Sequence, residues 1–281
     1  MLAALGDLVE DVVVRVGGPV NVASDTEARI ERRAGGSAAN TAVCAARLGH
    51  PARFLGQVGA DAIGTALLAE LQGAGVDVSM CRRGGSTGTI VALVDETGER
   101  TMLTDRRACV DLADPDRSWL DGVDVLHVPF YSLAGGPIAA TSDTVIGWAV
   151  DGGLAVSIDV SSTAVMDDVG LAQVRARISA AQPSVVFANA DEADLLGIDA
   201  PVAGALTVVK RGPRPAVIHR VDGSTVEVAA IEVPGVDDTT GAGDAFSAGF
   251  LTWGDWGDDP VGACGAGHRA AAGLLRSRGG R

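Results

Sequence analysis

The chain has 281 residues, 47% of them hydrophobic, which suffices for one large or two small domains and excludes an intrinsically disordered chain. Its formal net charge of −14 argues against an extended surface for nucleic acid or anionic membrane, although a small nucleotide site can still be locally positive. No uncharged apolar run approaches the ~18–20 residues that a membrane span requires. The four cysteines lack the spacing of metal or redox sites, so we expect free thiols in a cytoplasmic protein.

The N-terminal segment begins with a short apolar strand over residues 2–5, which ends at Gly6-Asp7. The segment carries no basic residue and turns acidic at once, so it does not fit a secretory signal peptide. Periodicity and end signals then predict three elements up to residue 73. They are a helix over 37–48 stopped by Gly49, a strand over 54–58, and a helix over 62–73 with Asp61 as its N-cap.

Two β-rich regions have no helices of their own. The first is residues 12–33, of which 25–33 are charged and extended. The second is residues 87–94 and 100–103, which are joined by turn residues at 95–98 in the manner of a hairpin. We therefore expect a small sheet that stands off the main domain, formed from about residues 10–34 and 86–105.

From residue 123 onward, strands alternate with helices. The expected strands are 123–128, 154–160, 184–188 and 206–210, with edge strands at 217–221 and 226–233. The expected helices are 138–150, 169–181 and 191–196, and a last helix over 260–276 with Pro260 at its first position. This alternation predicts an α/β fold with a mostly parallel sheet covered on both faces, in a single domain over residues 1–281.

The stretch from Asp238 to Phe246 stands out because it joins a strand to a helix through glycines. Helical spacing of apolar residues after it places the helix start near Gly243, with Thr239 or Thr240 as the expected N-cap. Free N–H groups and the helix dipole favour an anion at such a point. A carboxylate there, Asp244, suits a base that takes a proton from an attacking hydroxyl; the alternative is a capped helix after a glycine turn.

Polar residues and glycines gather at four predicted junctions between a strand and a helix, where open α/β sheets bind ligands. The junction residues are Gly6 and Asp7; Gly35, Gly36 and Asn40; Asn189 and Glu192; and Asp238 to Asp244. The P-loop pattern is absent, because the only lysine is Lys210, and the G-x-G-x-x-G dinucleotide fingerprint is absent as well. Phosphate is therefore expected to be held by backbone amides and a helix N-terminus, without a P-loop lysine.

Three motifs resemble the pfkB, or ribokinase-like, carbohydrate kinases. Gly35 to Asn40, with Arg47 to Gly49 and Gly56 to Gly64, resembles their N-terminal signature, and Asp238 to Phe246 resembles their C-terminal signature. Asn189 to Glu192 resembles their N-x-x-E element. The motifs occur in family order over nearly the whole chain. The resemblance implies a three-layer α/β/α ribokinase-like fold with a mostly parallel central sheet and a small β-sheet lid.

The resemblance also implies roles for matching residues. Asp244 matches the catalytic base, and the backbone N–H groups of Gly241, Ala242, Gly243 and Asp244 match the anion hole. Glu192 matches the residue that organises Mg²⁺ and its waters, and Asn189 matches a triphosphate contact. The implied sugar ligands are Asp7, Gly35, Gly36, Asn40 and, less strongly, Asp11. Thr239, Lys210 and Gly212 complete the expected nucleotide site, with a solvated basic turn as the alternative for Lys210 and Gly212.

Several other residues admit two interpretations. Arg100, Arg106 and Arg107 are near enough to the lid to reach a substrate, but surface charge is the favoured interpretation. Tyr131 either lines the sugar pocket or packs, and His268 is expected to be a partly buried helix histidine. The arginine that sugar-acid kinases of this family carry after the residue matching Asp159 is missing, which weakens a sugar-acid substrate.

Together these observations predict an enzyme that transfers the γ-phosphoryl group of ATP, with Mg²⁺, to a primary hydroxyl of a small sugar. A nucleoside kinase of the same fold is the first alternative, although aromatic residues are only 4% of the chain. A regulatory protein that binds sugar or nucleotide without catalysis is the second, and the intact Asp244 and Glu192 argue against it. For some family members the resemblance also implies a monovalent cation such as K⁺ near the Asp238 loop, and a homodimer formed through the lid.

Overall fold

Nine strands form the central sheet in the computed structural model of the chain, which describes residues 1–96, 99–236 and 238–279. Across the sheet they are β15 (Thr225–Val228), β14 (Ala216–His219), β13 (Leu206–Lys210), β12 (Val185–Asn189), β11 (Ala155–Asp159), β10 (Val125–Pro129), β1 (Leu2–Leu5), β4 (Ala52–Leu55) and β6 (Val76–Asp77). All strands from β13 to β6 run parallel, and β14 and β15 are antiparallel. Their continuous apolar runs fit a sheet that is buried on both faces.

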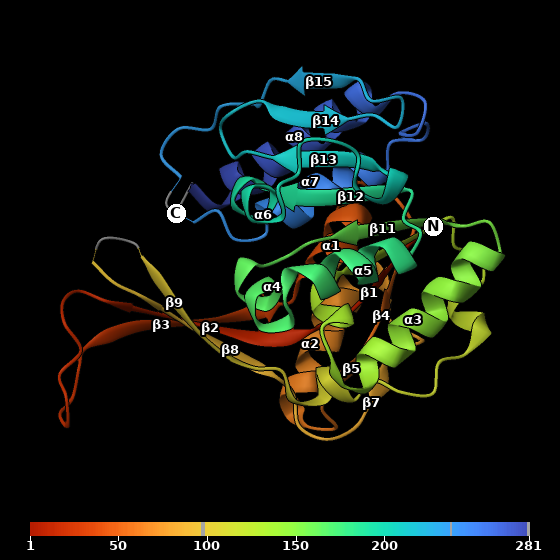
Figure 1. Cartoon of the computed structure of the whole chain (residues 1–281). Coiled ribbons are helices and arrows are strands. Elements are labelled where there is room, and N and C mark those ends of the chain that lie inside the picture. The colour runs from red at the N-terminus through yellow and green to blue at the C-terminus, as the bar shows by residue number, and fades with distance from the viewer. Residues whose placement is uncertain (97–98, 237, 280–281) are drawn as a thin grey trace.

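Helices cover both faces of this sheet (Figure 1). One face is covered by four helices: α1 (Ser37–Arg47), α2 (Ala62–Gly73), α7 (Ala242–Leu251) and α8 (Pro260–Gly279). Their side chains form a core cluster with Phe54, Phe187 and Val208 of the sheet. The other face is covered by α3 (Gly136–Asp151), α4 (Thr163–Val169), α5 (Leu171–Ala180) and α6 (Ala190–Leu196), which pack on Leu126, Ile158 and Val186. The expected three-layer α/β/α architecture with a mostly parallel sheet is confirmed.

A second sheet of four strands projects from the body of the molecule, at the left of Figure 1. In order it contains β3 (Ala28–Gly35), β2 (Val9–Val16), β8 (Thr89–Val94) and β9 (Arg100–Asp105). We call this sheet the lid. The turn expected at residues 95–98 includes Thr97 and Gly98, which lie outside the described residues.

The register of the lid assigns its side chains to two faces, because neighbours along a strand point to opposite sides. The inner face carries Asp11, Val13, Arg33, Ala92 and Arg100 in paired rows. Several of these line a cavity of about 30 Å³ together with Asp238 and Thr240. The opposite, outer face is mostly apolar and carries Val12, Val14, Ile30, Val91, Leu93 and Leu103.

Three expected elements differ from the structure. The strand expected over 226–233 ends at Val228, because β14, its only neighbour, is four residues long and offers no further pairing. The helix expected over 169–181 begins two residues later, as α5 after Gly170 with φ 88°, and α4, which ends at Val169, was not predicted. The strand expected over 54–58 divides at Gly56 into β4 and β5 (Gln57–Val58), and β5 pairs with β7 (Arg82–Arg83).

The expected helix ends are largely confirmed. Asp61 accepts a hydrogen bond from the N–H of Gly64 at 2.8 Å, Gly49 follows α1 with φ 85°, and Pro260 is the first residue of α8. Short 3-10 helices, not predicted, are η1 (Arg107–Asp111), η2 (Arg117–Leu120), η3 (Phe130–Leu133) and η4 (Val202–Gly204). Across the described residues, none of the helices is both long and apolar enough to cross a membrane.

Candidate active site

The N-terminus of α7 differs from expectation at its cap. Gly241, with φ 76°, is the N-cap, and no side chain caps the helix, so the prediction that Thr239 or Thr240 fills this position is wrong. The left-handed conformation turns the chain into the helix, which favours glycine. Thr239 contributes its carbonyl instead, which accepts from the N–H of Ala242 at 3.1 Å.

The N–H groups at this helix start are the expected anion hole. That of Ala242 is engaged in the turn, whereas those of Gly243 and Asp244 lie in the first turn of α7, where an α-helix supplies no acceptor. The helix dipole adds positive potential at the same place. The turn thus has donors available for a phosphoryl group beside a carboxylate.

Asp244 is held by two side chains from α1. Its Oδ1 accepts from Ser37 Oγ at 2.6 Å, and its Oδ2 accepts from Asn40 Nδ2 at 2.8 Å. Burial raises the pKa of Asp244 to about 6; the two hydrogen bonds lower it, the charge of Asp159 raises it and that of Lys210 lowers it. The carboxylate is therefore ionised at neutral pH while remaining far more basic than an exposed aspartate, as a general base requires.

The pH dependence of turnover should report this pKa. We expect kcat/KM to fall about tenfold per pH unit below pH ~6, because protonated Asp244 cannot accept a proton. Ser37→Ala removes a hydrogen bond that lowers the pKa, so the acidic limb should move to higher pH. The measurement is a kcat/KM profile from pH 4.5 to 8. Ser118→Ala removes a side-chain hydrogen bond to the exposed Asp116, to which the backbone N–H of residue 118 still donates, and should leave the limb in place. An unmoved limb in Ser37→Ala would contradict the assignment.

The glycine pair before α1 has a clear steric reason. A Cβ at Gly36, whose φ is 104°, would lie 2.2 Å from the carbonyl oxygen of Asp7, and a Cβ at Gly35 would lie 2.2 Å from Asp11 Oδ1. Both predicted sugar-binding aspartates therefore lie directly against this backbone. Asp11 Oδ2 lies 3.9 Å from Arg33 Nε, and burial raises the pKa of Asp11. The pair brings the backbone close to the carboxylates and leaves room for hydroxyl groups.

Asp7 is engaged by an arginine. Its two oxygens accept from Arg106 Nε at 2.6 Å and from Arg106 NH2 at 2.8 Å, a bidentate pair, and the guanidinium lies 5.9 Å from the ring centre of Tyr131. The interpretation of Arg106 as surface charge is therefore wrong, because Asp7 holds the guanidinium group and the side chain is only 18% exposed. Arg107 is exposed and pairs with Asp105 at 2.6 Å, so for this residue the surface interpretation is confirmed.

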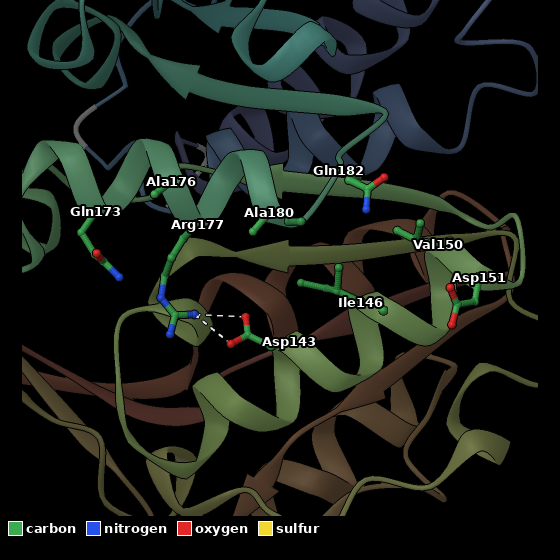
Figure 2. A pocket seen from close by; sticks show the side chains of 11 residues that line it. Asp143, Ile146, Val150, Asp151, Gln173, Ala176, Arg177, Ala180 and Gln182 are labelled. Carbon is green, nitrogen blue, oxygen red and sulfur yellow. Dashed lines mark hydrogen bonds and ion pairs between the residues drawn. The ribbon is translucent and has the colours of Figure 1, made fainter.

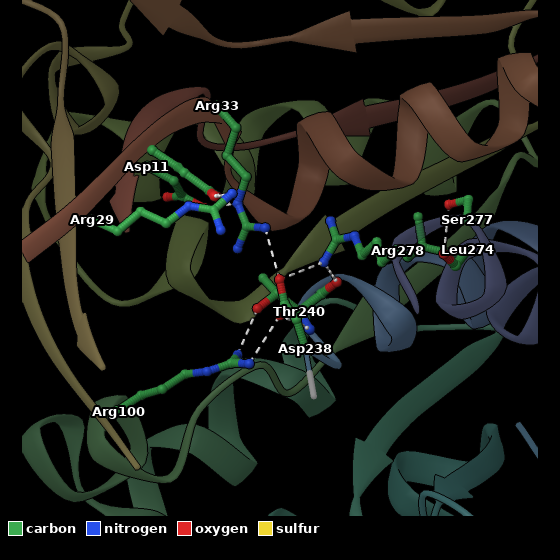
Figure 3. Close-up of polar contacts among 10 residues, drawn as sticks. Asp11, Arg29, Arg33, Arg100, Asp238, Thr240, Leu274, Ser277 and Arg278 are labelled. Carbon is green, nitrogen blue, oxygen red and sulfur yellow. Dashed lines mark hydrogen bonds and ion pairs between the residues drawn. The ribbon is translucent and has the colours of Figure 1, made fainter. Parts of the chain in front are cut away.

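Arg100 also points inward. Its NH2 donates to Asp238 Oδ1 at 2.9 Å and its NH1 donates to Thr240 Oγ1 at 2.6 Å (Figure 3). The surface-charge interpretation is wrong here too, because Arg100 lies on the inner face of the lid, opposite Val94. The lid and the loop before α7 are thus in direct contact.

On the other side of Asp244, Asn189 and Glu192 form a capping box at the start of α6. Asn189 Oδ1 accepts from the N–H of Glu192 at 2.9 Å, and the Glu192 carboxylate accepts from the N–H and Nδ2 of Asn189 at 2.7 and 2.6 Å. Burial, and then the charge of Asp159, raise the pKa of Glu192 to about 7. The N-x-x-E element therefore has a structural role in addition to any role in binding.

Lys210 is buried beneath the same turn. Its Nζ lies 2.5 Å from Asp159 Oδ2, which also accepts from Ser247 Oγ at 3.2 Å, so a solvated basic turn is wrong for this residue. A Cβ at Gly243 would lie 3.4 Å from Lys210 Nζ, which places the ammonium group against the first turn of α7. Gly212, with φ 60°, turns the chain just after β13.

The residues around Lys210 fit the hydrated Mg²⁺ that the family resemblance implies. The carboxylates of Asp159, Glu192 and Asp244 all interact electrostatically with this one lysine, which leaves an excess of negative charge. Among the described residues no three or more histidine, cysteine or acidic side chains are arranged to hold a metal ion. The arrangement suits an ion held mainly by phosphate oxygens and water, with Glu192 nearby.

His268 behaves as expected for a helix histidine. It is 8% exposed, its Nε2 lies 3.3 Å from the Val228 carbonyl oxygen, and its ring packs edge-on against Phe246. Burial lowers its pKa, so it is neutral at physiological pH. The structure thus explains this residue through packing beneath α7.

Sequence reasoning missed the site role of three residues: Ser37, Arg33 and Asp159. Ser37 was part of the N-terminal motif but had no role of its own, and only the packing of α1 against α7 shows its contact with Asp244. Arg33 donates to Asp238 Oδ2 at 2.9 Å, and alternation along β3 was the available signal for its inward direction. For Asp159 the signal was its place at the end of a strand.

A larger cavity lies away from these residues. Figure 2 shows a groove of about 420 Å³ between α3 and α5, across which Arg177 NH1 lies 3.0 Å from Asp143 Oδ1. Small residues on α5, such as Ala176 and Ala180, leave this space open. None of the described residues that line it belongs to the predicted site, so size does not indicate the place of the chemistry.

The chain is similar to known proteins over most of its length. The family model described as "pfkB family carbohydrate kinase" matches residues 1–281. The ATP-dependent ribose-1-phosphate kinase of Halopiger xanaduensis is 33% identical over 279 residues, covering 91% of this chain and 87% of that protein. A fructokinase of Klebsiella pneumoniae is 31% identical over 248 residues, covering 83% and 80%. The crystal structure of adenosine kinase from Sinorhizobium meliloti superposes with a TM-score of 0.84 at 23% identity, covering 98% and 93%.

Proposed function

Because the chain belongs to the pfkB family of carbohydrate kinases, we propose that it transfers the γ-phosphoryl group of ATP to a hydroxyl of a small sugar, with Asp244 as catalytic base. The observation that carries this proposal is the position of the Asp244 carboxylate. Ser37 and Asn40 fix it at the N-terminus of α7, beside backbone donors that suit a phosphoryl group.

In the proposed step the acceptor hydroxyl gives its proton to the carboxylate of Asp244 while its oxygen forms a bond to the γ-phosphorus. The bond between that phosphorus and the oxygen bridging to the β-phosphate breaks, and ADP leaves with the electron pair. The N–H groups of Gly241, Gly243 and Asp244 face the charge on the transferred group, and their position at a helix N-terminus is preorganised for it.

The nucleotide is proposed to bind on the side of β12 and β13. Asn189, Lys210, Gly212 and Thr239 lie at the ends of these strands and in the loop before α7. The 33% identical relative is named as ATP-dependent, which supports ATP as the donor. Mg²⁺, when bound with ATP, would neutralise and orient the phosphates, with Glu192 holding its water shell.

A nucleoside acceptor is the second candidate. The adenosine kinase structure shares the fold with this chain at 23% identity, which speaks to the fold alone. Bases are commonly held by stacking on aromatic rings, yet neither lid segment, residues 9–35 or 86–105, contains Phe, Tyr or Trp. The hydrogen-bonding groups of Asp7, Asp11 and Asn40 suit the hydroxyl groups of a sugar better.

A coupled ADP-release assay tests the proposed function. Pentoses, hexoses, sugar acids, sugar phosphates and nucleosides are supplied with ATP and Mg²⁺, and phosphorus NMR identifies the product. We expect a sugar or sugar derivative to stimulate ADP release well above the rate with ATP alone. A best substrate among the nucleosides would favour the second candidate, and a lack of stimulation by every acceptor would contradict both.

A monovalent cation has weaker support in this chain. Both carboxylate oxygens of Asp238, the residue nearest the expected cation site, accept hydrogen bonds from arginines. The residues present therefore do not fit a K⁺ ion bound to this side chain.

A homodimer through the lid is also proposed. The outer face of the lid is mostly apolar, and Ile30 and Leu103 on it are 58% and 59% exposed. A contiguous apolar face of this kind marks an interaction site, and a second copy of the same face would be complementary to it. The four cysteines are free in the structure, and together with the need for ATP this supports a cytoplasmic location.

The dimer is tested by charging that face. The double variant Ile30→Glu and Leu103→Glu is expected to elute as a monomer at concentrations where the unmodified protein is a dimer, because two buried carboxylates per subunit would lack partners. Light scattering after size-exclusion chromatography measures the mass. Val20→Glu with Val22→Glu, two exposed residues of the loop between β2 and β3, is the matched control. A monomeric unmodified protein would refute the interface.

A further inference from the structure

Three arginines from distant parts of the chain converge on one carboxylate, that of Asp238 (Figure 3). Arg33 NH1 and Arg100 NH2 each donate to it at 2.9 Å, and Arg278 NH1 lies 3.4 Å from Oδ2. Arg278 also donates to the carbonyl oxygen of Thr240. We call Arg33, Arg100 and Arg278 the arginine cluster. They come from β3, β9 and α8, so the fold itself assembles them.

Three guanidinium groups share the carboxylate of Asp238 in the arginine cluster. Arg33 also lies 3.9 Å from Asp11, a carboxyl group whose pKa is raised by burial. Burial and the neighbouring charges of Arg33 and Arg100 lower the pKa of Arg278, as expected where like charges lie close together. A chain with a formal net charge of −14 thus concentrates three guanidinium groups at one half-buried place. Such an arrangement suits an anionic ligand.

The cluster lies on the acceptor side of Asp244. Arg33 is two residues before Gly35, on the strand that leads into the predicted sugar-binding turn, and it shares the inner face of the lid with Asp11 and Arg100. The cavity of about 30 Å³ between this face and Thr240 is lined by the same residues. The proposed ATP site, at the ends of β12 and β13, lies on the other side of Asp244. The anion is therefore expected on the acceptor.

We propose that the acceptor is a sugar phosphate and that the arginine cluster binds its phosphate group. This inference rests on the proposed kinase function and specifies the acceptor. The hydroxyl oxygen of the sugar phosphate forms the bond to the γ-phosphorus, its proton passes to Asp244, and the bond to the bridging oxygen breaks. The products are a sugar bisphosphate and ADP.

Two features favour a phosphate over a carboxylate or a neutral sugar. A phosphate dianion offers three oxygens to three guanidinium groups, and arginine forks match it with paired N–H···O bonds. Asp238 is the anion that these donors contact in the structure, at 2.9 Å from both Arg33 and Arg100. The long arginine side chains can turn from Asp238 toward a ligand, which enlarges the small cavity beside them.

Acceptor selectivity tests the proposal. The probes are ribose 1-phosphate and fructose 1-phosphate, ribose and fructose, and gluconate as a sugar acid, each with ATP and Mg²⁺ in the ADP-release assay. We expect the intact protein to prefer a sugar phosphate to the matching sugar. Arg33→Gln and Arg100→Gln should each lower kcat/KM for the sugar phosphate by about 10- to 100-fold, the size of a lost charge-assisted hydrogen bond, and so reduce the ratio between the two acceptors.

Matched variants separate charge from folding. Arg32→Gln removes the neighbouring charge of β3, which pairs with Glu10 on the surface, and should leave the ratio unchanged. Arg100→Lys keeps the charge and should recover part of the selectivity. Thermal melting of each variant shows that it is folded.

The outcomes distinguish the two proposals. If no acceptor stimulates ADP release, the kinase function itself fails. If the intact protein phosphorylates ribose or fructose but neither sugar phosphate, the function stands and the inference is overturned. Preference for gluconate would assign the arginine cluster to a carboxylate and also overturn it. Equal losses of kcat/KM for the sugar phosphate and the matching sugar in Arg33→Gln and Arg100→Gln would assign the cluster to the transferred phosphoryl group or to a structural contact. That outcome would also overturn the inference.

Discussion

Asp244→Asn is expected to lower turnover by about 10²- to 10⁴-fold, the usual contribution of a general base, while the affinities for ATP and acceptor change little. The amide has nearly the same shape, so the first turn of α7 and its N–H groups stay in place. What it loses is the ability to take the hydroxyl proton, together with one of the two acceptor oxygens that face Ser37 and Asn40. Single-turnover kinetics measures the chemical step, and calorimetry measures the two affinities.

A matched substitution elsewhere controls for the loss of a carboxylate. Asp258 is exposed in the connection between α7 and α8, so Asp258→Asn should leave turnover within a factor of two. Unaltered turnover in Asp244→Asn would remove this residue as the base. A loss of ATP affinity equal to the loss of turnover would indicate a binding role in its place.

Lys210→Met is expected to reduce the free energy of unfolding by about 3–5 kcal/mol, the usual result of removing one partner of a buried ion pair. The substitution leaves the carboxylate of Asp159, 7% exposed, without the cation 2.5 Å away. It also removes a charge that lowers the pKa values of Glu192 and Asp244, so both should rise and the acidic limb of turnover should move to higher pH. Chemical denaturation measures the change in stability.

A double-mutant cycle shows whether the pair itself is responsible. Lys210→Met combined with Asp159→Leu should be more stable than Lys210→Met alone, because no buried charge remains unpaired. Arg214→Met removes an exposed charge in the turn after β13 and should change stability by no more than about 0.5 kcal/mol. Additive effects within the cycle would show that Lys210 and Asp159 do not depend on each other.

The parts of the fold that could be predicted from sequence are those with strong local signals. Gly49, Asp61 and Pro260 end or begin helices for reasons contained within a few residues, and the structure confirms each of them. Buried strands such as β10 and β12 are continuous apolar runs, which mark a parallel sheet. Glycines between a strand and a helix predict the turn before α7 for the same local reason, and its binding of phosphate stays a prediction.

The parts that failed depend on what lies far away in sequence. The strand expected over 226–233 ends early because β14 is short, which no pattern within that segment reveals. Ser37 and Asp244 are 207 positions apart, and Lys210 and Asp159 are 51 apart, so only the packed fold shows that they meet. Arginine is usually a surface residue, so the sequence alone favours exposure for Arg100 and Arg106. The side chain of Arg100 points inward because of the strand register, and Arg106 stands at the turn into η1.

The contact of Arg100 with Asp238 and Thr240 has a thermodynamic consequence. It joins the inner face of the lid to the loop that runs directly into the turn at Gly241, so the two substrates would share one structural element. Any rearrangement of that contact on binding one substrate changes the free energy of binding the other. By linkage the effect is reciprocal: the factor by which the acceptor raises the affinity for ATP equals the factor by which ATP raises the affinity for the acceptor. When ATP is bound without the acceptor, the loop before α7 would then differ from its arrangement with both substrates bound. Transfer of the γ-phosphoryl group to water would be disfavoured until the acceptor is present.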